Sequence, residues 1–424
     1  MPKNDLAAER ANQRNAVTAC FLGWTLDAFD FFVLTFVLAP IGKDFHRSVV
    51  EMSAAITASL ITRPVGAFVF GLLADRYGRR LPLMLDVLFY SVIEVLSGFA
   101  PSFSIFIFLR LLYGIGMGGE WGVGASLALE SVPEKRRGMI SGFLQEGYAF
   151  GYLLAAVAFW QVFPRFGWRA MFFVGGLPAL LTLFIRFKVK ESKAWQAGAS
   201  RLDWRTYWKS IFRNGKRFGY LVLLMALVNF ISHGTQDLYP TFLQSQRGYT
   251  PGTTALITAI SMIGAILGGI LVGLYSDRRG RRRAMVISLL LGIVLIPAWI
   301  AAPNFGVILL GAFLMQFMVQ GAWGVIPAHI NELSPDTLRG FFPGFAYQLG
   351  VVFAASSAQM EALMARHLSY GHAMGIFAAI VLAAGAIAVA FGPEAHGIRF
   401  GRDANLVLQS ESENSPRVRA PRKE

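Results

Sequence analysis

Long apolar segments separated by short charged loops run along almost the whole chain. Each is long enough to cross a hydrocarbon layer as a helix, which takes about 20 residues. The pattern therefore predicts an all-α integral membrane protein with twelve transmembrane helices. The predicted spans are residues 16–40, 50–73, 82–100, 104–130, 139–163, 169–187, 219–243, 253–275, 284–302, 305–331, 341–364 and 371–391.

The chain repeats itself at a constant offset. The decapeptide Gly71–Arg80 returns as Gly273–Arg282, with seven of ten positions identical and an offset of 202 residues. The same offset relates Pro133–Gly138 to Pro335–Gly340. A constant offset through several motifs indicates duplication. The fold should therefore be two pseudo-symmetric six-helix bundles.

The duplication sets the predicted domain boundaries. The longest loop is predicted to carry an amphipathic helix at the membrane surface, because Trp204, Tyr207 and Trp208 stand among basic residues. The C-terminal tail is polar and basic. The four parts are a first bundle (1–187), a linker (188–218), a second bundle (219–392) and a tail (393–424).

Composition and charge agree with this layout. Only 15% of residues are charged, against about 25% in soluble domains. With the N terminus inside, 31 of the 39 Lys and Arg residues lie on the inner side and 6 on the outer side. This bias predicts that both termini are cytoplasmic. We expect the membrane to be a bacterial inner (plasma) membrane. The bias also explains the net charge of +14, because the basic residues face an anionic lipid leaflet. No nucleic-acid partner is needed to account for this charge.

Several functional classes are not supported. The chain has no nucleotide-binding loop and no cluster of metal ligands, which argues against an enzyme or an ATP-driven pump. We expect no metal and no cofactor other than the proton gradient. The single Cys20 excludes an internal disulfide. We expect a monomer.

Charged residues recur in the inner loops at the repeat offset. We expect one cluster in each half, which together hold the cytoplasmic side shut and break when it opens. The alternative is solvated surface pairs of little energy. The predicted gating residues are Asp75, Arg79, Glu130 and Arg137 in the first half and Asp277, Arg281, Glu332 and Arg339 in the second.

Charges inside spans are costly, so each suggests a function. Asp27 and Asp30 share one helix face, and two close carboxylates in a low dielectric favour retention of a proton. They are predicted proton carriers, although one of them could merely pair with Arg63 or Arg110. Glu120 could be a third proton site or the partner of an arginine, and the sequence does not decide.

Arg63 lies within the second span and needs a carboxylate from the protein or a substrate. Arg110 begins a glycine-rich stripe, which favours a structural role. Glu94 and Asp86, in the third span, are given less weight as site residues.

The seventh span carries a polar stripe. His233 and Asp237 are four residues apart and can share a proton near neutral pH. The alternative for His233 is a simple hydrogen bond between helices. The stripe consists of Asn229, His233, Gln236 and Asp237.

Six spans, a basic loop, six spans and the duplicated decapeptide resemble the major facilitator superfamily. That resemblance implies two bundles around a central cavity with alternating access. The stretch Asn229–Thr241 resembles the fungal lactate permeases of the Jen group, in the sialate:proton symporter branch. Leu26–Phe31 and Gly119–Trp121 resemble that branch generally, and Tyr347–Gly350 is similar to the same group.

The resemblance implies proton-coupled uptake of a small monocarboxylate such as lactate or pyruvate. Arg63 would bind the carboxylate, and Asn229, Gln236 and Gln348 would hydrogen-bond its other oxygens. The expected partners are an organic acid, protons and membrane lipids. Alternatives are a symporter for sialic acid or another organic acid, a drug–proton antiporter, and a receptor that senses carboxylates without moving them.

Overall fold

The computed structural model describes residues 3–198 and 204–401, and over these residues it holds helices and no strand. It confirms the predicted fold class, two six-helix bundles. The first bundle comprises α1 (Lys3–Asp44), α2 (Val49–Ile61) with α3 (Arg63–Tyr77), α4 (Arg80–Gly98), α5 (Phe103–Ser131), α6 (Arg137–Gln145) with α7 (Gly147–Val174), and α8 (Ala179–Lys188).

The second bundle repeats this order after two short linker helices, α9 (Lys193–Gly198) and α10 (Trp204–Arg213). Part of the predicted linker, residues 199–203, and the tail from 402 to 424 lie outside the described residues. The bundle comprises α11 (Gly215–Gln236) with α12 (Tyr239–Ser245), α13 (Pro251–Arg279), α14 (Arg281–Ile300), α15 (Phe305–Leu333), α16 (Phe342–Ala354) with α17 (Ser357–Met364), and α18 (Tyr370–Phe391).

Ten continuous helical segments of the described chain are long and apolar enough to cross a membrane. One of them, Glu134–Lys188, spans 55 residues and holds the fifth and sixth crossings. The eleventh crossing, formed by α16 and α17, is not among the ten. The count therefore agrees with twelve crossings.

Several spans predicted as continuous are broken. The second divides at Thr62, whose hydroxyl lies 2.7 Å from the carbonyl oxygen of Leu111 on α5. Pro64 and Pro240 stand at the start of the second pieces of their spans, where the missing amide proton has no partner to lose.

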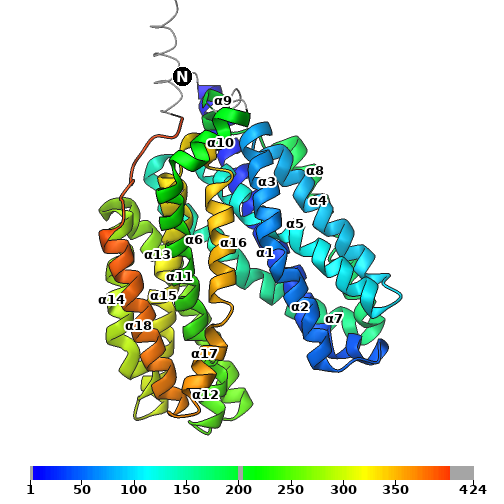
Figure 1. The fold of residues 1–424 in the computed structure, drawn as a ribbon, viewed down its shortest axis with the longest axis vertical. Coiled ribbons are helices and arrows are strands. Elements are labelled where there is room, and N and C mark those ends of the chain that lie inside the picture. The colour runs from blue at the N-terminus through cyan, green and yellow to red at the C-terminus, as the bar shows by residue number, and fades with distance from the viewer. Residues whose placement is uncertain (1–2, 199–203, 402–424) are drawn as a thin grey trace, which may run out of the picture.

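The two halves meet at one end of the molecule and diverge towards the other (Figure 1). The end where they meet holds the N terminus, α9 and α10, and we call it the linker end. Helices that start at the opposite end are capped by their own preceding Ser, Thr or Asn, which accepts a hydrogen bond from an early amide. These caps are Ser48, Ser102, Thr250, Asn304 and Ser369.

The topology can be tested with single cysteines in a Cys20→Ser background. Lys43 ends α1 away from the linker end, and Lys209 lies on α10; both are exposed. A membrane-impermeant maleimide should label a cysteine at position 43 from one face of the membrane and a cysteine at position 209 from the other. Labelling of both from the same face would contradict the twelve-span topology.

Candidate functional site

At the linker end, a carboxylate from each half caps a helix of the other half. Asp75 accepts hydrogen bonds from the amides of Gly340 and Phe341 at 2.6 and 3.1 Å, at the start of α16. Asp277, its repeat equivalent, accepts from Gly138 and Met139 at 2.7 and 2.9 Å, at the start of α6. A negative charge at a helix N terminus is stabilising, so these contacts tie the halves together.

Arginines hold these carboxylates in place. Arg79 lies 2.6 Å from Asp75 and 3.0 Å from Glu130. Burial disfavours the charge on Arg79, but Glu130 and Asp75 outweigh it and raise the pKa of Arg79 above its ordinary value. In the second half, Arg281 lies 2.8 Å from Asp277 and 2.9 Å from Glu332.

Two further arginines pair across the halves. The sequence analysis groups Arg137 and Arg339 with their own halves. In the structure, Arg137 lies 3.7 Å from Glu332, and Arg339 lies 3.6 Å from Glu130. The crossing is possible because the loops approach closely: a side chain at Gly138 would collide with the backbone of Gly273. We call the eight predicted gating residues, as placed here, the latch.

The turns and the linker support the latch. Gly78 and Gly280 adopt φ of 96° and 97°, a conformation that other residues rarely adopt. Tyr207 of α10 donates a hydrogen bond to Asp75 at 2.9 Å. Burial, together with the charge of Asp75, raises the pKa of Tyr207 above its ordinary value. The linker therefore packs directly on the latch, while α10 still exposes Trp204 and Trp208.

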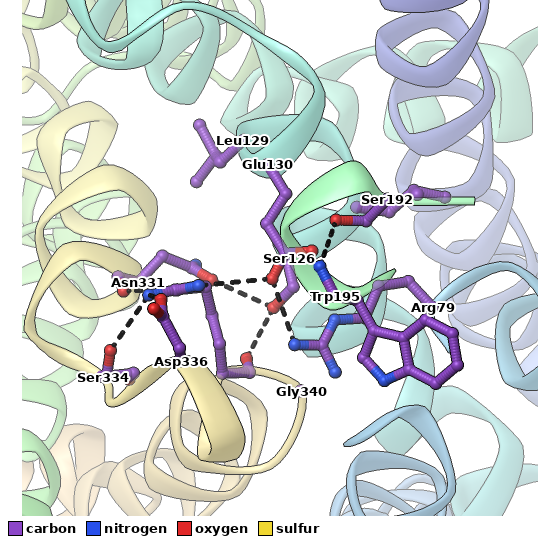
Figure 2. Close-up of polar contacts among 12 residues, drawn as sticks. Arg79, Ser126, Leu129, Glu130, Ser192, Trp195, Asn331, Ser334, Asp336 and Gly340 are labelled. Carbon is purple, nitrogen blue, oxygen red and sulfur yellow. Dashed lines mark hydrogen bonds and ion pairs between the residues drawn. The ribbon is translucent and has the colours of Figure 1, made fainter. Parts of the chain in front are cut away.

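Contacts between the halves continue inward from the latch. Figure 2 shows Arg79 at Glu130 and, beside them, Ser126 of α5, whose hydroxyl oxygen lies 2.9 Å from the side-chain oxygen of Asn331 on α15. Ser141 of α6 donates to the carbonyl of Gly324 at 2.6 Å.

Deeper still, three aromatic rings from the two halves pack together. The ring of Tyr347 lies 4.4 Å from Trp121 and 5.7 Å from Trp323, between ring centroids. The halves are thus closed from the latch down to this aromatic layer.

The predicted proton carriers lie in the core of the first half. Asp27, Asp30 and Glu120 are at most 1% exposed, and their carboxylate oxygens have no hydrogen-bond partner in the described part of the chain. Asp30 and Glu94 lie close together at Gly175. A Cβ atom on this glycine would lie 2.8 Å from Oδ1 of Asp30 and 2.5 Å from Cγ of Glu94. The site therefore gathers buried carboxylates without the pairing that an ionised carboxylate needs.

The two arginines within the spans of the first half do not pair with Asp27 or Asp30, which was the alternative considered in the sequence analysis. Arg110 pairs with Glu94 at 2.8 Å, and both side chains are fully buried. Glu94 is thus more important than the sequence analysis allows; the signal for it is that a buried Arg110 needs an acid on an adjacent span. Neither Asp27 nor Asp30 forms an ion pair with Arg63 or Arg110 among the described residues.

Arg63 is the unpaired arginine of the site. It is 6% exposed, and its Nε and Nη2 have no partner among the described residues. Its carbonyl lies against Gly118 of α5, and the amide of Gln348 reaches the carbonyl of the same glycine at 3.5 Å. The backbone of Arg63 and the side chain of Gln348 therefore meet at Gly118 from the two halves.

The residues of the polar stripe on the seventh span have different partners. Asn229 donates to the carbonyl of Met225 at 2.8 Å, and Gln236 donates to Gln316 of α15 at 2.8 Å. His233 and Asp237 lie 3.2 Å apart with side chains 42% and 40% exposed. Gln316 was missed from the sequence, although it stands as a polar residue in an apolar span.

No group of three His, Cys, Asp or Glu side chains in residues 3–198 and 204–401 is placed to hold a metal ion.

Fold, duplication and a polar site between two bundles define a membrane transporter. The chain belongs to the Major Facilitator Superfamily, whose model matches residues 20–254. A second model, "Sugar (and other) transporter", matches residues 214–396. The chain is therefore a multi-pass membrane transporter and not an enzyme.

Individual relatives match this chain over nearly their full length. The probable 4-methylmuconolactone transporter of Cupriavidus pinatubonensis is 31% identical, over 91% of this chain and 92% of that protein. The sialic acid transporter NanX of Escherichia coli is 32% identical, over 88% and 91%. The solved proton:xylose symporter XylE superposes with a TM-score of 0.73 at 18% identity, covering 94% of this chain and 99% of that one.

The Glu94–Arg110 pair yields a prediction about stability. Arg110→Met leaves a buried carboxylate unpaired and should lower the free energy of unfolding by about 3–5 kcal/mol. The double variant Arg110→Met/Glu94→Gln removes both charges and should recover most of the loss. Denaturant titration in detergent measures both.

A surface pair supplies the control for this experiment. Arg169 lies 4.0 Å from Asp44, with side chains 43% and 51% exposed, so Arg169→Met should change the free energy of unfolding by less than about 1 kcal/mol. An Arg110→Met protein as stable as the parent would contradict the assignment.

Proposed function

We propose that this protein is a proton-coupled symporter that takes up a small organic monocarboxylate by alternating access. The observation that carries the proposal is Arg63. It is a buried, unpaired guanidinium between the halves, beside buried acids that also lack partners. A fork of donors in a low dielectric favours a carboxylate.

The closed latch identifies the conformational state. The Lys and Arg bias supports an orientation with the linker end and both termini in the cytoplasm, and we assign the protein to a bacterial inner membrane. Because the latch closes this end, the described conformation faces outward. The eight latch residues act as the gate, and no cofactor other than the proton gradient drives the cycle.

Coupling follows from the charges around Arg63. Its positive charge acts on both Asp27 and Glu120. A substrate carboxylate bound to Arg63 offsets that charge, so a proton then binds more readily to Asp27. By linkage, a proton on Asp27 removes a negative charge near Arg63 and so favours binding of the substrate carboxylate there. Asp30 and Glu120 share this proton network, and His233 with Asp237 forms a second, half-exposed pair in the other half.

The number of unpaired cations favours a monocarboxylate. Within the spans that the structure describes, Arg110 is paired and Arg63 is not. One free guanidinium accommodates one carboxylate, and the amides of Gln348, Asn229 and Gln236 would hydrogen-bond its other oxygens. The relatives named above are transporters of 4-methylmuconolactone and sialic acid, which makes a larger organic acid the second candidate. The transporter works as a monomer in contact with membrane lipids.

Uptake into proteoliposomes tests the function and the proton sites together. Lactate and pyruvate should accumulate when the outside is acidic, and xylose should not. Asp27→Asn and Asp30→Asn should abolish accumulation yet leave exchange, because binding persists without proton coupling. Asp44→Asn, an exposed acid near the end of α1, is the control.

Normal pH-driven uptake in both core variants would exclude Asp27 and Asp30 as proton carriers. Uptake of sialic acid but of neither monocarboxylate would overturn the substrate class while leaving symport intact.

Arg63 yields a prediction about affinity. Arg63→Ala should weaken substrate binding by a factor of tens or more, since loss of a buried charge contact costs about 2–5 kcal/mol. Arg63→Lys should retain only part of the parent affinity, because an ammonium group lacks the bidentate fork of a guanidinium. Calorimetry on the purified variants measures this, with Arg47→Ala, an exposed arginine, as the control. Unchanged affinity in folded Arg63→Ala would show that Arg63 only neutralises nearby acids.

A further inference from the structure

The chain that follows α18 crosses the latch from one half to the other. Glu394 accepts a hydrogen bond from the amide of Arg282, and His396 contacts the carbonyl of Asp277 at 3.1 Å, both in the second half. Further on, the carbonyl of Ile398 accepts from Arg137 of the first half at 2.7 Å. The segment Glu394–Gly401 is therefore bound to both halves, and we call it the strap.

Phe400 lies at the centre of this crossing. The guanidinium carbons of Arg137 and Arg339 lie 3.4 and 3.7 Å from the centre of its ring. One arginine comes from each half, and each also lies within 4 Å of a glutamate of the opposite half. Two like charges so close together repel, and an aromatic ring between them attracts both.

We propose that Arg137 and Arg339 form a binding site for the protein's own C-terminal segment, and that occupation by Phe400 holds the linker end closed. The site exists only in the closed state, because opening moves the two arginines apart with their halves. A group that binds one state and not the other shifts the equilibrium towards the state it binds. Release of the strap therefore sets how often the linker end opens.

The chain contains its own reporter of that opening. Cys20 is 3% exposed and lines a small pocket behind the latch with Trp121 of α5 and Pro327 of α15. Pro327 belongs to the other half, so separation of the halves at the linker end uncovers the thiol. The rate of Cys20 alkylation by N-ethylmaleimide then measures the open fraction, with no need for substrate or a proton gradient.

Substitutions at Phe400 separate the aromatic contact from simple packing. Phe400→Ala and Phe400→Leu should each raise the alkylation rate about tenfold, because both lose the two cation–π contacts. Phe400→Trp keeps them and should stay near the parent rate. Phe391→Ala is the control, since Phe391 is 89% exposed at the end of α18. An unchanged rate in Phe400→Ala, or an equal rise in Phe391→Ala, would overturn the proposal.

A peptide experiment tests the binding site directly. Protein truncated after Gly392 should alkylate as fast as Phe400→Ala, and a peptide of residues 393–401 should restore slow alkylation. The same peptide with Ala at position 400 should not. Failure of the native peptide, with the melting temperature of the truncated protein unchanged, would exclude the site. Because alkylation needs no transport, such a failure would leave the proposed symport untouched.

Discussion

The reciprocal capping of helices by Asp75 and Asp277 is the constraint on which the closed structure depends. The first amides of a helix have no partner within it, and at the start of α16 and of α6 the partner comes from the other half. Charge-assisted hydrogen bonds of this kind are worth about 1.5–3 kcal/mol each. Because the capping is crossed, the halves cannot separate at the linker end without uncapping both helices together.

The closed latch protects an unequal distribution of charge. Among the described residues, the core of the first half buries a group of acids against the guanidinium groups of Arg63 and Arg110. These acids are Asp27, Asp30, Asp86, Glu94 and Glu120. Buried charges without partners are too costly to persist. These acids therefore cannot all be ionised while the core of the first half is shielded from water. The second half offers amides, the half-exposed His233–Asp237 pair and one buried acid without a partner among the described residues, Glu361. Most of the buried acids thus lie in the first half, beside Arg63.

The duplication allowed the fold and the latch residues to be predicted, but not which of them pair. Under a shift of 202 residues, a contact of Glu130 with Arg137 and one with Arg339 are equally consistent with the repeat, so sequence alone cannot separate them. The break at Thr62 was missed for a related reason, since it depends on the carbonyl of Leu111 on another helix. Glu94 was underrated because its importance comes from Arg110, whose distance from it the sequence does not encode.

The way the ion pairs are shared explains how so polar a latch can open and close. Glu130 contacts Arg79 of its own half and Arg339 of the other, and Glu332 contacts Arg281 and Arg137 in the same manner. When the halves part, each glutamate keeps its own arginine, so no carboxylate is left buried and unpaired. The large penalty for breaking a buried pair is thereby avoided. What opening removes is the second arginine, the helix caps and the ring between Arg137 and Arg339, and water reaches these groups as they separate.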